Sequence, residues 1–580
     1  MIRLVLFFSS LLLAGAIRFH DVIPDGESHF HGIPVEKYVT SMNRLMEVTN
    51  KLMNKDMEPL PRFEDIEWDQ NSTRPDMNPF LYQGDITLSE IQLDALVEGF
   101  EAKLAEKEGR PIAERLYSAN TYFWQKFPIQ WTVNYQNPPA GGIGLIRQGI
   151  AMWEKESCIT FQENTNIPQM VFFQGKGCNS PVGYHGINQV SIGHGCGHPA
   201  TVAHEIAHSL GLFHTQMRPD SQKHVTIYWS NIHQSTWFAF KPPPAYYFAE
   251  DRGLPYDVGS LMHYGKTAFH INPQKPTILP KNPNYYQSMG QRASIAFTDA
   301  KEVNMIYCNN ICPNKLPCLH GGYTDPKDCS KCRCPEGLGG KLCDTVAKSP
   351  AACGPGLLKA TDEYQTLSMN GALKCNYKIM APEGKKIAII VDYASFNGGN
   401  FDSACDYDFV EVKYGAQLQT VGARFCPSSY NSRQQKVVIP SEQSTNETFV
   451  LYQSYKSNYG FSLRYRYEPI DDIRPIHETS STAAPTTVTD GSSLEPTEAF
   501  VSTSEATVSD QWGPWSDCSS PCGGCGSRIR SKLGNHEITE KEYCNLKPCK
   551  DVFGPNPLFC CKPFYFNDKF QKCVKFEKKP

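Results

Sequence analysis

The stretch Thr201-Val-Ala-His-Glu-Ile-Ala-His-Ser-Leu-Gly-Leu-Phe-His214 decides how this chain folds and what it can bind. His204 and His208 are four residues apart, so on a helix both side chains project from one face and can bind a single ion. Gly211 can adopt a positive φ angle, which lets the helix end and the chain turn back towards His214. Three neutral imidazoles suit zinc, and three protein ligands leave coordination positions open for water and substrate. The stretch therefore predicts a catalytic zinc site.

Glu205 follows the first of these histidines, one step round the helix, where its carboxylate can reach a water molecule held by the ion. The alternative is a buried amphipathic helix whose histidines only satisfy hydrogen bonds. A bare H-E-x-x-H pattern occurs by chance in roughly one chain of this length in a hundred, so alone it is only suggestive. The glycine and the third histidine make the coincidence roughly three orders of magnitude rarer, which favours catalysis.

The first 16 residues have the pattern of a signal peptide. Arg3 precedes an almost wholly apolar run over residues 4–13, and Ala14-Gly-Ala16 supplies a cleavage site of small residues. The run is too short to span a membrane, and no later apolar run is long enough; a buried N-terminal helix is the alternative. All 22 cysteines lie at or after Cys158, and in the secretory route we expect them to form disulfides. A secreted, extracellular protein is therefore expected.

Length and composition divide the chain into segments of different character. With 580 residues there is room for roughly four domains. The net charge is -4 and there is no basic run, which argues against nucleic acid or an anionic membrane surface as a partner. The expected segments are a signal peptide over 1–16, a cysteine-free segment over 17–115, a mixed globular domain over 116–309, a six-cysteine module over 310–344, a β-rich domain over 353–468, a Ser/Thr/Pro-rich linker over 469–510, a module with alternating Trp and Arg over 511–550 and a cysteine-containing tail over 551–580.

The cysteine-free segment contains a helix signal and a turn signal. Thr87-Leu-Ser-Glu90 has the spacing of a capping box, and a helical stripe follows at Leu93, Leu96, Val97, Phe100 and Leu104. Just upstream, Tyr82-Gln-Gly-Asp85 predicts an exposed turn whose aspartate can cover an open metal position; read alone, a solvated aspartate is the simpler interpretation. Asn71 and Asn446 begin glycosylation acceptor sequences.

The segment over 116–309 mixes short strand-like runs with helical ones, which predicts an α+β domain. The expected strands cover residues 129–133, 170–173 and 190–192, and the expected helix covers 143–155. Farther along, Asp257-Val-Gly-Ser-Leu-Met-His-Tyr-Gly265 has glycines on both sides of Met262 and Tyr264, which marks a tight turn. Read alone, Met262 is ordinary core packing.

The downstream modules depend on disulfides and on strand patterns. Six cysteines within 310–344 leave no room for a hydrophobic core, so bridges must hold this module, and 15 pairings are open. Alternating runs within 353–468 predict an antiparallel β-sandwich. Those runs cover residues 386–391, 409–413, 436–439, 449–453 and 461–467. The linker is too polar to fold and has the composition of an O-glycosylated spacer.

Residues 116–308 resemble the astacin family of zinc endopeptidases, within the metzincins. The resemblance is carried by His204–His214, Ser260-Leu-Met-His-Tyr264, Gly177-Cys-Asn-Ser-Pro-Val-Gly183, Pro276-Thr-Ile278 and Gly290-Gln-Arg292. The later segments are similar to an EGF-like module, a CUB domain and a thrombospondin type-1 repeat, the arrangement of a nematode subgroup of astacins. The resemblance implies a multidomain chain, with an α+β metzincin domain followed by these modules.

The resemblance also implies roles for single residues. His204, His208 and His214 would bind one Zn²⁺, Tyr264 would be a movable ligand, and Met262 would lie beneath the site. Disulfides would join Cys158 to Cys308 and Cys178 to Cys196.

The segment over 17–115 would be a propeptide, in which Asp85 occupies the water position and keeps a zymogen latent. The family's glutamate after the third histidine is absent, because Thr215 stands there. No dibasic site precedes the catalytic domain, and we expect activation after Arg115 by a trypsin-like protease.

Three classes of function compete for this sequence. The first is a secreted zinc metalloendopeptidase acting on extracellular matrix or cuticle proteins, with Glu205 as the general base and an activating protease as a further partner. The second is a catalytically inert matrix-binding protein that acts through its CUB and thrombospondin modules. The third is a zinc enzyme of another hydrolytic class, such as an amidase or deaminase. The intact ligands and Glu205 favour the first over the second, and the protein-binding modules favour it over the third.

Overall fold

The computed structural model describes two compact units, residues 1–476 and 477–580, within which some segments are not covered. The described residues are 16–23, 26–53, 60–69, 74–111, 122–243, 252–396, 404–426 and 437–469, together with short strands between 526 and 575. Arg115 and Asn71 lie outside them, as do all but one residue of the expected signal peptide and of the expected linker. Within the described residues, no helix combines the length and the apolar character needed to cross a membrane.

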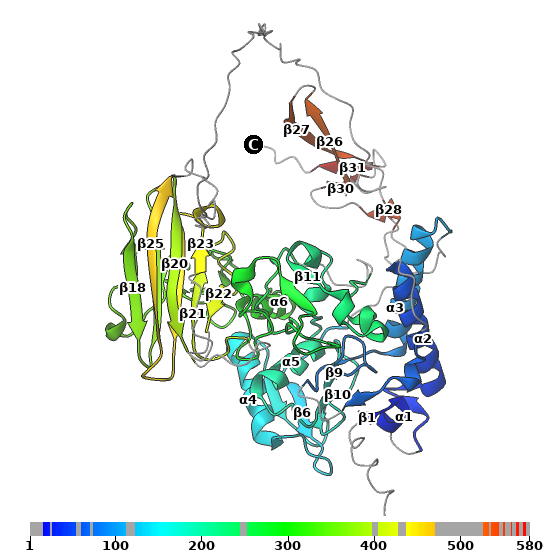
Figure 1. Cartoon of the computed structure of the whole chain (residues 1–580). Coiled ribbons are helices and arrows are strands. Elements are labelled where there is room, and N and C mark those ends of the chain that lie inside the picture. Colours follow the sequence, from blue (N-terminus) through cyan, green and yellow to red (C-terminus); the bar gives the residue numbers. More distant parts are fainter. Residues whose placement is uncertain are drawn as a thin grey trace, which may run out of the picture. The chain divides into compact units, whose positions relative to one another are not determined.

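The domain expected over residues 116–309 contains one large sheet, which includes the predicted strands (Figure 1). Its strands are β6 (Ile129–Val133), β7 (Phe161–Glu163), β8 (Met170–Phe173), β9 (Cys178–Pro181) and β10 (Asn188–Ile192). β7, β6, β8 and β10 run parallel to one another, and β9 pairs antiparallel with β10. The α+β prediction for this domain is therefore confirmed.

Helices α4 (Gly142–Glu156) and α5 (Pro199–Ser209) pack against each other and share one core with this sheet. Gly149 permits the close approach, because a Cβ atom there would lie 2.5 Å from a side-chain carbon of Val202. The indole nitrogen of Trp153 donates to the carbonyl of Ala203 at 2.8 Å and fixes the two helices in register. The helix that carries the histidines thus rests on a rigid support.

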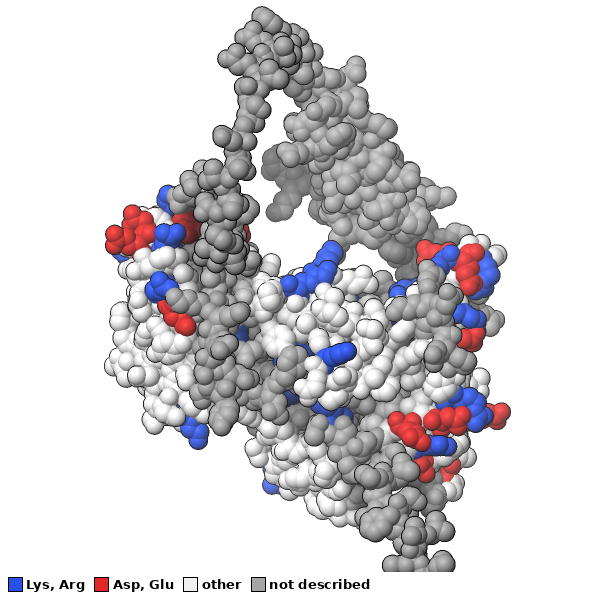
Figure 2. Space-filling view, viewed as in Figure 1, with Lys and Arg blue, Asp and Glu red and all other residues white. Residues whose placement is uncertain are grey.

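The cysteine-free segment shares one hydrophobic core with the second half of the following domain, and it also reaches that domain's sheet through one short strand. Helices α2 (Val35–Leu52) and α3 (Glu90–Lys107) pack together, and surface ion pairs such as Lys37–Glu90 and Arg44–Glu101 join them. Figure 2 shows that charged side chains gather over these two helices. Strand β5 (Ile86–Thr87) then pairs parallel with β9, which makes it the sixth strand of the sheet in the described residues. The remaining short elements described here are β1 (Ala16–Ile17), α1 (Phe19–Val22), β2 (His29–Phe30), β3 (Ile33–Pro34), a 3₁₀ turn (Phe63–Asp65) and β4 (Trp68–Asp69).

The capping box of α3 differs from the prediction. Ser89 is the N-cap: its hydroxyl accepts from the Gln92 N–H, and the Gln92 side chain accepts from the Ser89 N–H. The Thr87–Glu90 box is wrong because Thr87 belongs to β5. The expected stripe is correct, since Leu93, Leu96, Phe100 and Leu104 are buried and Val97 packs against the same core.

The second half of the catalytic domain is largely irregular and ends in α6 (Phe297–Tyr307). Its strands are β11 (Val225–Ile227) and β12 (Ile278–Pro280), and short 3₁₀ turns cover residues 215–217, 221–223, 229–231, 234–239 and 283–285. Disulfides join Cys158 to Cys308 and Cys178 to Cys196. The first ties the end of α4 to the end of α6, and the second ties β9 to the loop before α5.

The six-cysteine module and the CUB domain complete the first unit. The module's bridges are Cys312–Cys329, Cys318–Cys332 and Cys334–Cys343, and its strands are β13 (Tyr323–Thr324), β14 (Cys332–Arg333), β15 (Leu338–Gly339) and β16 (Thr345–Val346). The described part of the CUB domain is a sandwich of two sheets, in the orders β17-β19-β24-β21-β22 and β18-β25-β20-β23. These strands are β17 (Leu357–Lys359), β18 (Gln365–Asn370), β19 (Lys374–Met380), β20 (Lys385–Ser395), β21 (Phe409–Lys413), β22 (Ala423–Phe425), β23 (Val437–Ile439), β24 (Glu447–Gln453) and β25 (Gly460–Pro469). The predicted β-sandwich is confirmed, and among its described strands only the short pair β17–β19 is parallel.

The second unit contains short antiparallel hairpins. The pairs are β26 (Gly526–Lys532) with β27 (Asn535–Cys544), β28 (Cys549–Lys550) with β29 (Leu558–Phe559), and β30 (Phe564–Asn567) with β31 (Lys572–Lys575).

Candidate metal centre

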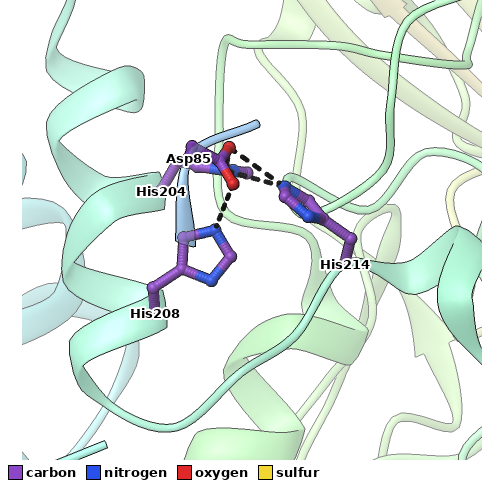
Figure 3. Close-up of side chains that lie close together, drawn as sticks. All are labelled: Asp85, His204, His208 and His214. Carbon is purple, nitrogen blue, oxygen red and sulfur yellow. Dashed lines mark hydrogen bonds and ion pairs between the residues drawn. The ribbon is translucent and has the colours of Figure 1, made fainter. Parts of the chain in front are cut away.

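Helix α5 and the turn after it bring three imidazoles together. His204 and His208 lie on one face of α5, and Gly211, at φ 99°, lets the chain reverse so that His214 returns to the same point. Among the described residues, one ligand atom from each histidine and one from Asp85 all lie within 4.8 Å of one another (Figure 3). All four side chains are buried.

Each imidazole is oriented by a partner on its Nδ1 atom. His204 Nδ1 lies 2.9 Å from the carbonyl oxygen of Leu261, and His208 Nδ1 lies 2.7 Å from that of Leu212. A carbonyl oxygen only accepts, so Nδ1 must carry the hydrogen in both rings and Nε2 keeps its lone pair for a metal. His214 Nδ1 lies 2.9 Å from Oε1 of Gln83, a residue of the cysteine-free segment. The three Nε2 atoms therefore face one another as metal ligands would.

Asp85 occupies the space between these Nε2 atoms (Figure 3). Its Oδ2 lies 3.2 Å from His204 Nε2 and 3.1 Å from His214 Nε2, and its Oδ1 lies 3.5 Å from His208 Nε2. The turn that presents it is not exposed, contrary to the prediction from sequence: Asp85 is 1 % exposed. Gly84 has φ +88°, and a Cβ atom there would lie 2.6 Å from the carbonyl oxygen of Asp76, so the turn inserts into the site only because this residue is glycine.

The charge state of the cluster suits a bound cation. Burial lowers the pKa of His204 to about 3 and also lowers the pKa of His214, which favours the neutral form of these two imidazoles. Burial opposes ionisation of Asp85 as well, but the neighbouring His214, His208 and His204 outweigh it and hold the pKa of Asp85 well below its usual range.

The donor set passes a direct test for zinc. His208 Nε2 and Asp85 Oδ1 are buried without a hydrogen-bond partner, which is costly unless another group satisfies them. A cation among the three Nε2 atoms would satisfy both. Three imidazoles and one carboxylate form a set that zinc accepts in tetrahedral geometry.

Glu205 stands beside this cluster with its carboxylate unengaged. Both carboxylate oxygens are buried and have no hydrogen-bond partner among the described residues. Burial raises the pKa of Glu205 well above its usual value, and the negative charges of Asp85 and Asp76 add to the effect. A carboxylate that favours its protonated form has the affinity for a proton that a general base needs.

A pocket of about 210 Å³ opens next to Glu205. Arg292 lines this pocket, and the sequence did not predict that it would. Arg292 and Thr201 line the pocket from the domain that holds the histidines, and Asp76 lines it from the cysteine-free segment. Arg292 Nη2 lies 3.7 Å from Asp76 Oδ2, so a carboxylate already faces this guanidinium. Only the Gly290-Gln-Arg292 motif pointed towards this residue, and the motif says nothing of which pocket the arginine enters.

The methionine turn supports the cluster from the other side. Tyr264 donates its hydroxyl to the carbonyl oxygen of Gln83 at 2.6 Å, and its ring lies 4.8 Å from that of His214 between centroids. Met262 is buried, and its carbonyl accepts from the Thr215 N–H at 2.9 Å. The turn thus binds the segment that carries His214, and Thr215 takes part in this contact.

The fold and the three-histidine site on α5 and its following turn define a zinc-dependent metalloendopeptidase. The model of the astacin peptidase family matches residues 117–308, the CUB model matches 356–465 and the thrombospondin type 1 model matches 510–551. Zinc metalloproteinase nas-34 of Caenorhabditis elegans is 33% identical over 545 residues, which cover 87% of this chain and 84% of that protein. This chain belongs to the astacin family, and its cofactor is one zinc ion.

A second relative and a solved structure are also similar to this chain. Zinc metalloproteinase nas-36 of Caenorhabditis briggsae is 33% identical over 506 residues, 83% of this chain and 77% of that protein. Among solved structures, the hatching enzyme high choriolytic enzyme 1 of Oryzias latipes is 29% identical, covers 32% of this chain and 94% of its own, and has a TM-score of 0.29.

Proposed function

We propose that this chain is made as a secreted, latent zymogen whose mature form hydrolyses peptide bonds in extracellular matrix or cuticle proteins. The observation that supports it most is the placement of Asp85, buried between the three Nε2 atoms, where a substrate or a water molecule would otherwise enter. Signal-like residues 1–16, which fall almost wholly outside the described segments, motivate the assignment to the secretory route.

Latency in this proposal comes from the propeptide segment lying along the cleft. The Ser180 N–H donates to the carbonyl of Asp85 at 2.9 Å, and the Cys178 N–H donates to that of Pro75 at 3.2 Å. Both donors belong to the sheet edge β9, so removal of the segment frees them to bind a substrate backbone by adding a strand. Cleavage of the chain between the segment and the catalytic domain, followed by loss of the segment, would expose both the metal site and this edge.

Zinc, when bound, acts as a Lewis acid that lowers the pKa of a water molecule and polarises a carbonyl group. Glu205 removes the proton from the attacking water and later passes it to the nitrogen of the departing amine. The Tyr264 hydroxyl, which here donates to the Gln83 carbonyl, is free after activation to donate to the oxygen of the scissile carbonyl. A single donor of that kind contributes roughly 2.7–4 kcal/mol.

The experiment that tests this function compares wild-type protein with Glu205→Gln after both have been processed to the mature form. Glu205→Gln should bind zinc as wild type does and lose nearly all cleavage of casein or gelatin, because the amide cannot take a proton. Peptides released from a complex protein extract by wild type and not by the variant then identify the substrates. A variant that cleaved casein nearly as fast as wild type would refute the assignment of the base.

The alternative, an inert protein that binds matrix through its CUB and thrombospondin modules, makes the opposite prediction. It requires matrix binding without any proteolysis that the Glu205→Gln change removes. The unengaged carboxylate of Glu205 beside a complete ligand set favours the enzyme.

A further inference from the structure

The CUB domain contacts two of the elements that line the pocket beside Glu205. The Arg292 N–H donates to Asp406 Oδ1 at 2.9 Å, and the Tyr407 hydroxyl contacts Nε2 of His198. His198 is the N-cap of α5, and Arg292 is itself a wall of the pocket. Residues 405–407, the CUB segment that precedes β21, therefore lie close to the pocket beside Glu205.

Hydrogen bonds and a disulfide fix this CUB segment in position. The Cys405 N–H donates to the carbonyl of Gln287 at 2.8 Å, and the Gln287 side chain accepts from the Cys426 N–H at 3.0 Å. A disulfide joins Cys405 to Cys426, so the two segments that make this contact are covalently linked. The carbonyl of Tyr407 accepts from the Gln453 side chain at 2.8 Å. The segment is thus fixed to the catalytic domain and to its own sheet.

The chemistry at Glu205 shows which half of a substrate would meet this segment. Glu205 delivers a proton to the departing amine, so residues on the carboxyl side of the cut lie on its side of the metal. His198 precedes Glu205 by seven residues, which corresponds to about 10 Å along a helix. An extended peptide covers that distance in roughly three residues.

Tyr407 offers a surface beside His198, at the start of α5. Its hydroxyl is engaged, yet the residue is 48% exposed, and Tyr455 nearby is 67% exposed. The Tyr455 N–H donates to Asp408 Oδ1 at 2.7 Å, so this neighbour is also held by its backbone. A fixed aromatic ring binds an apolar or aromatic side chain with little loss of conformational entropy.

We propose that the CUB domain completes the cleft on the carboxyl side of the cut, with Tyr407 binding an apolar or aromatic substrate side chain about three residues beyond the scissile bond. Asp406 is a positioning residue that holds Arg292 against the pocket. The inference rests on the proposed peptidase activity and adds to it a preference for extended polypeptides. Short peptides do not reach Tyr407 and gain nothing from it.

The test uses the full, activated chain and two fluorogenic peptides built on a sequence that wild type cleaves. The peptides are identical up to the cut; one ends two residues beyond it and the other ends five residues beyond it, with leucine at the third. Tyr407→Ala should lower kcat/KM about fivefold for the long peptide, through KM, and spare the short one. Equal losses on both peptides, or no loss on either, would show that Tyr407 does not bind substrate.

Tyr364→Ala is the matched control. Tyr364 is an exposed CUB tyrosine, 39% exposed, that packs over Arg464 and Arg466 of β25 in the other sheet. Its replacement by alanine should leave kcat/KM unchanged for both peptides. Should wild type cleave no peptide at all, the proposed function fails and this inference fails with it, which is a different result from cleavage that ignores Tyr407.

Asp406 is tested by a pair of variants on the same peptides. Asp406→Ala should raise KM for both peptides with little change in kcat, because Arg292 lines the pocket that both reach. Asp406→Asn keeps an oxygen that can accept from the Arg292 N–H and should restore the wild-type KM. Failure of this rescue, or a loss confined to thermal stability, would contradict the positioning role.

Discussion

Asp85 and the three histidines depend on one another for their charge and their place. A buried carboxylate is costly unless cations or hydrogen-bond donors surround it. Asp85 lies 3.1–3.5 Å from the three imidazole Nε2 atoms, and a cation held by their lone pairs would be the partner that the carboxylate needs. The same imidazoles have no other ligand among the described residues. Replacing Asp85 therefore changes the metal site directly, without altering the helix that presents the histidines.

Asp85→Ala should give activity before any cleavage of the propeptide. Loss of a charged contact of this kind is worth roughly 1.5–3 kcal/mol, so we expect roughly a 10- to 150-fold rise in peptide cleavage by the uncut chain. Asp76→Ala is the control, because Asp76 lies in the same segment and faces Arg292 rather than the imidazoles. If uncut Asp85→Ala stayed silent while its processed form was active, the latency role would be wrong.

At the level of single residues, some members of the site can be predicted from the sequence and others cannot. The three histidines and Glu205 could be predicted because they lie within eleven residues on one helix and its turn, where spacing fixes geometry. Gln83 and Arg292 could not, because their contacts with His214 and Asp76 join positions far apart in the chain. Asp85 was expected on an exposed turn, since a turn signal does not show which surface will cover it.

Among the elements, the methionine turn is anchored to α6 by one carboxylate. Asp299 accepts from the Ser260 hydroxyl at 2.6 Å and from the N–H groups of Leu261 and Ala296 at 2.8 and 3.0 Å. Leu261 is also the residue whose carbonyl orients His204. The stability of the turn and the orientation of a metal ligand are thus coupled through Asp299.

Asp299→Ala should lower the free energy of unfolding by about 3 kcal/mol, because it leaves buried N–H groups without acceptors. The thermal midpoint should fall by roughly 6–12 °C, and zinc should bind more weakly. Asp299→Asn retains an oxygen for the N–H groups and should lose less on both counts. Calorimetry together with zinc titration measures these effects, and an Asp299→Ala protein that melts as wild type does would contradict them.

Helices α3, α4 and α5 and several of the longer strands follow from the sequence, whereas the decisive short elements do not. The stripe of α3 and the strands of the catalytic sheet and the sandwich have regular periods that reflect one buried face. Strand β5 has two residues, both buried, so no alternation marks it. Its presence also explains the wrong capping box, because Thr87 pairs with β9 instead of capping α3.

At the scale of the whole first unit, the CUB domain packs directly on the catalytic domain. Asp257 accepts from the Val421 N–H of the CUB domain and from the Thr298 hydroxyl at the start of α6. Gly259 lies against Val421, where a Cβ atom would be 2.4 Å from the valine Cβ. No sequence pattern predicts this contact, because two folded surfaces form it.

Gly259→Ala should destabilise this contact by about 1–3 kcal/mol, the usual cost of overpacking. Gly144→Ala is the control: it lies in α4 with nothing within 4 Å of an added Cβ, so a helix-favouring residue should stabilise it slightly. Differential scanning calorimetry of the full chain distinguishes the two. A Gly259→Ala chain as stable as the Gly144→Ala chain would contradict the packing described.

The most direct test of the central claim is a zinc titration of the mature, chelator-stripped protein, with metal content and cleavage of a protein substrate measured together. We expect the stripped protein to be folded and inactive, and activity to return in proportion to zinc and to level off at one ion per chain. Undiminished cleavage by the stripped protein, or a folded, active chain without metal, would contradict the claim that the three histidines hold the zinc on which peptide hydrolysis depends.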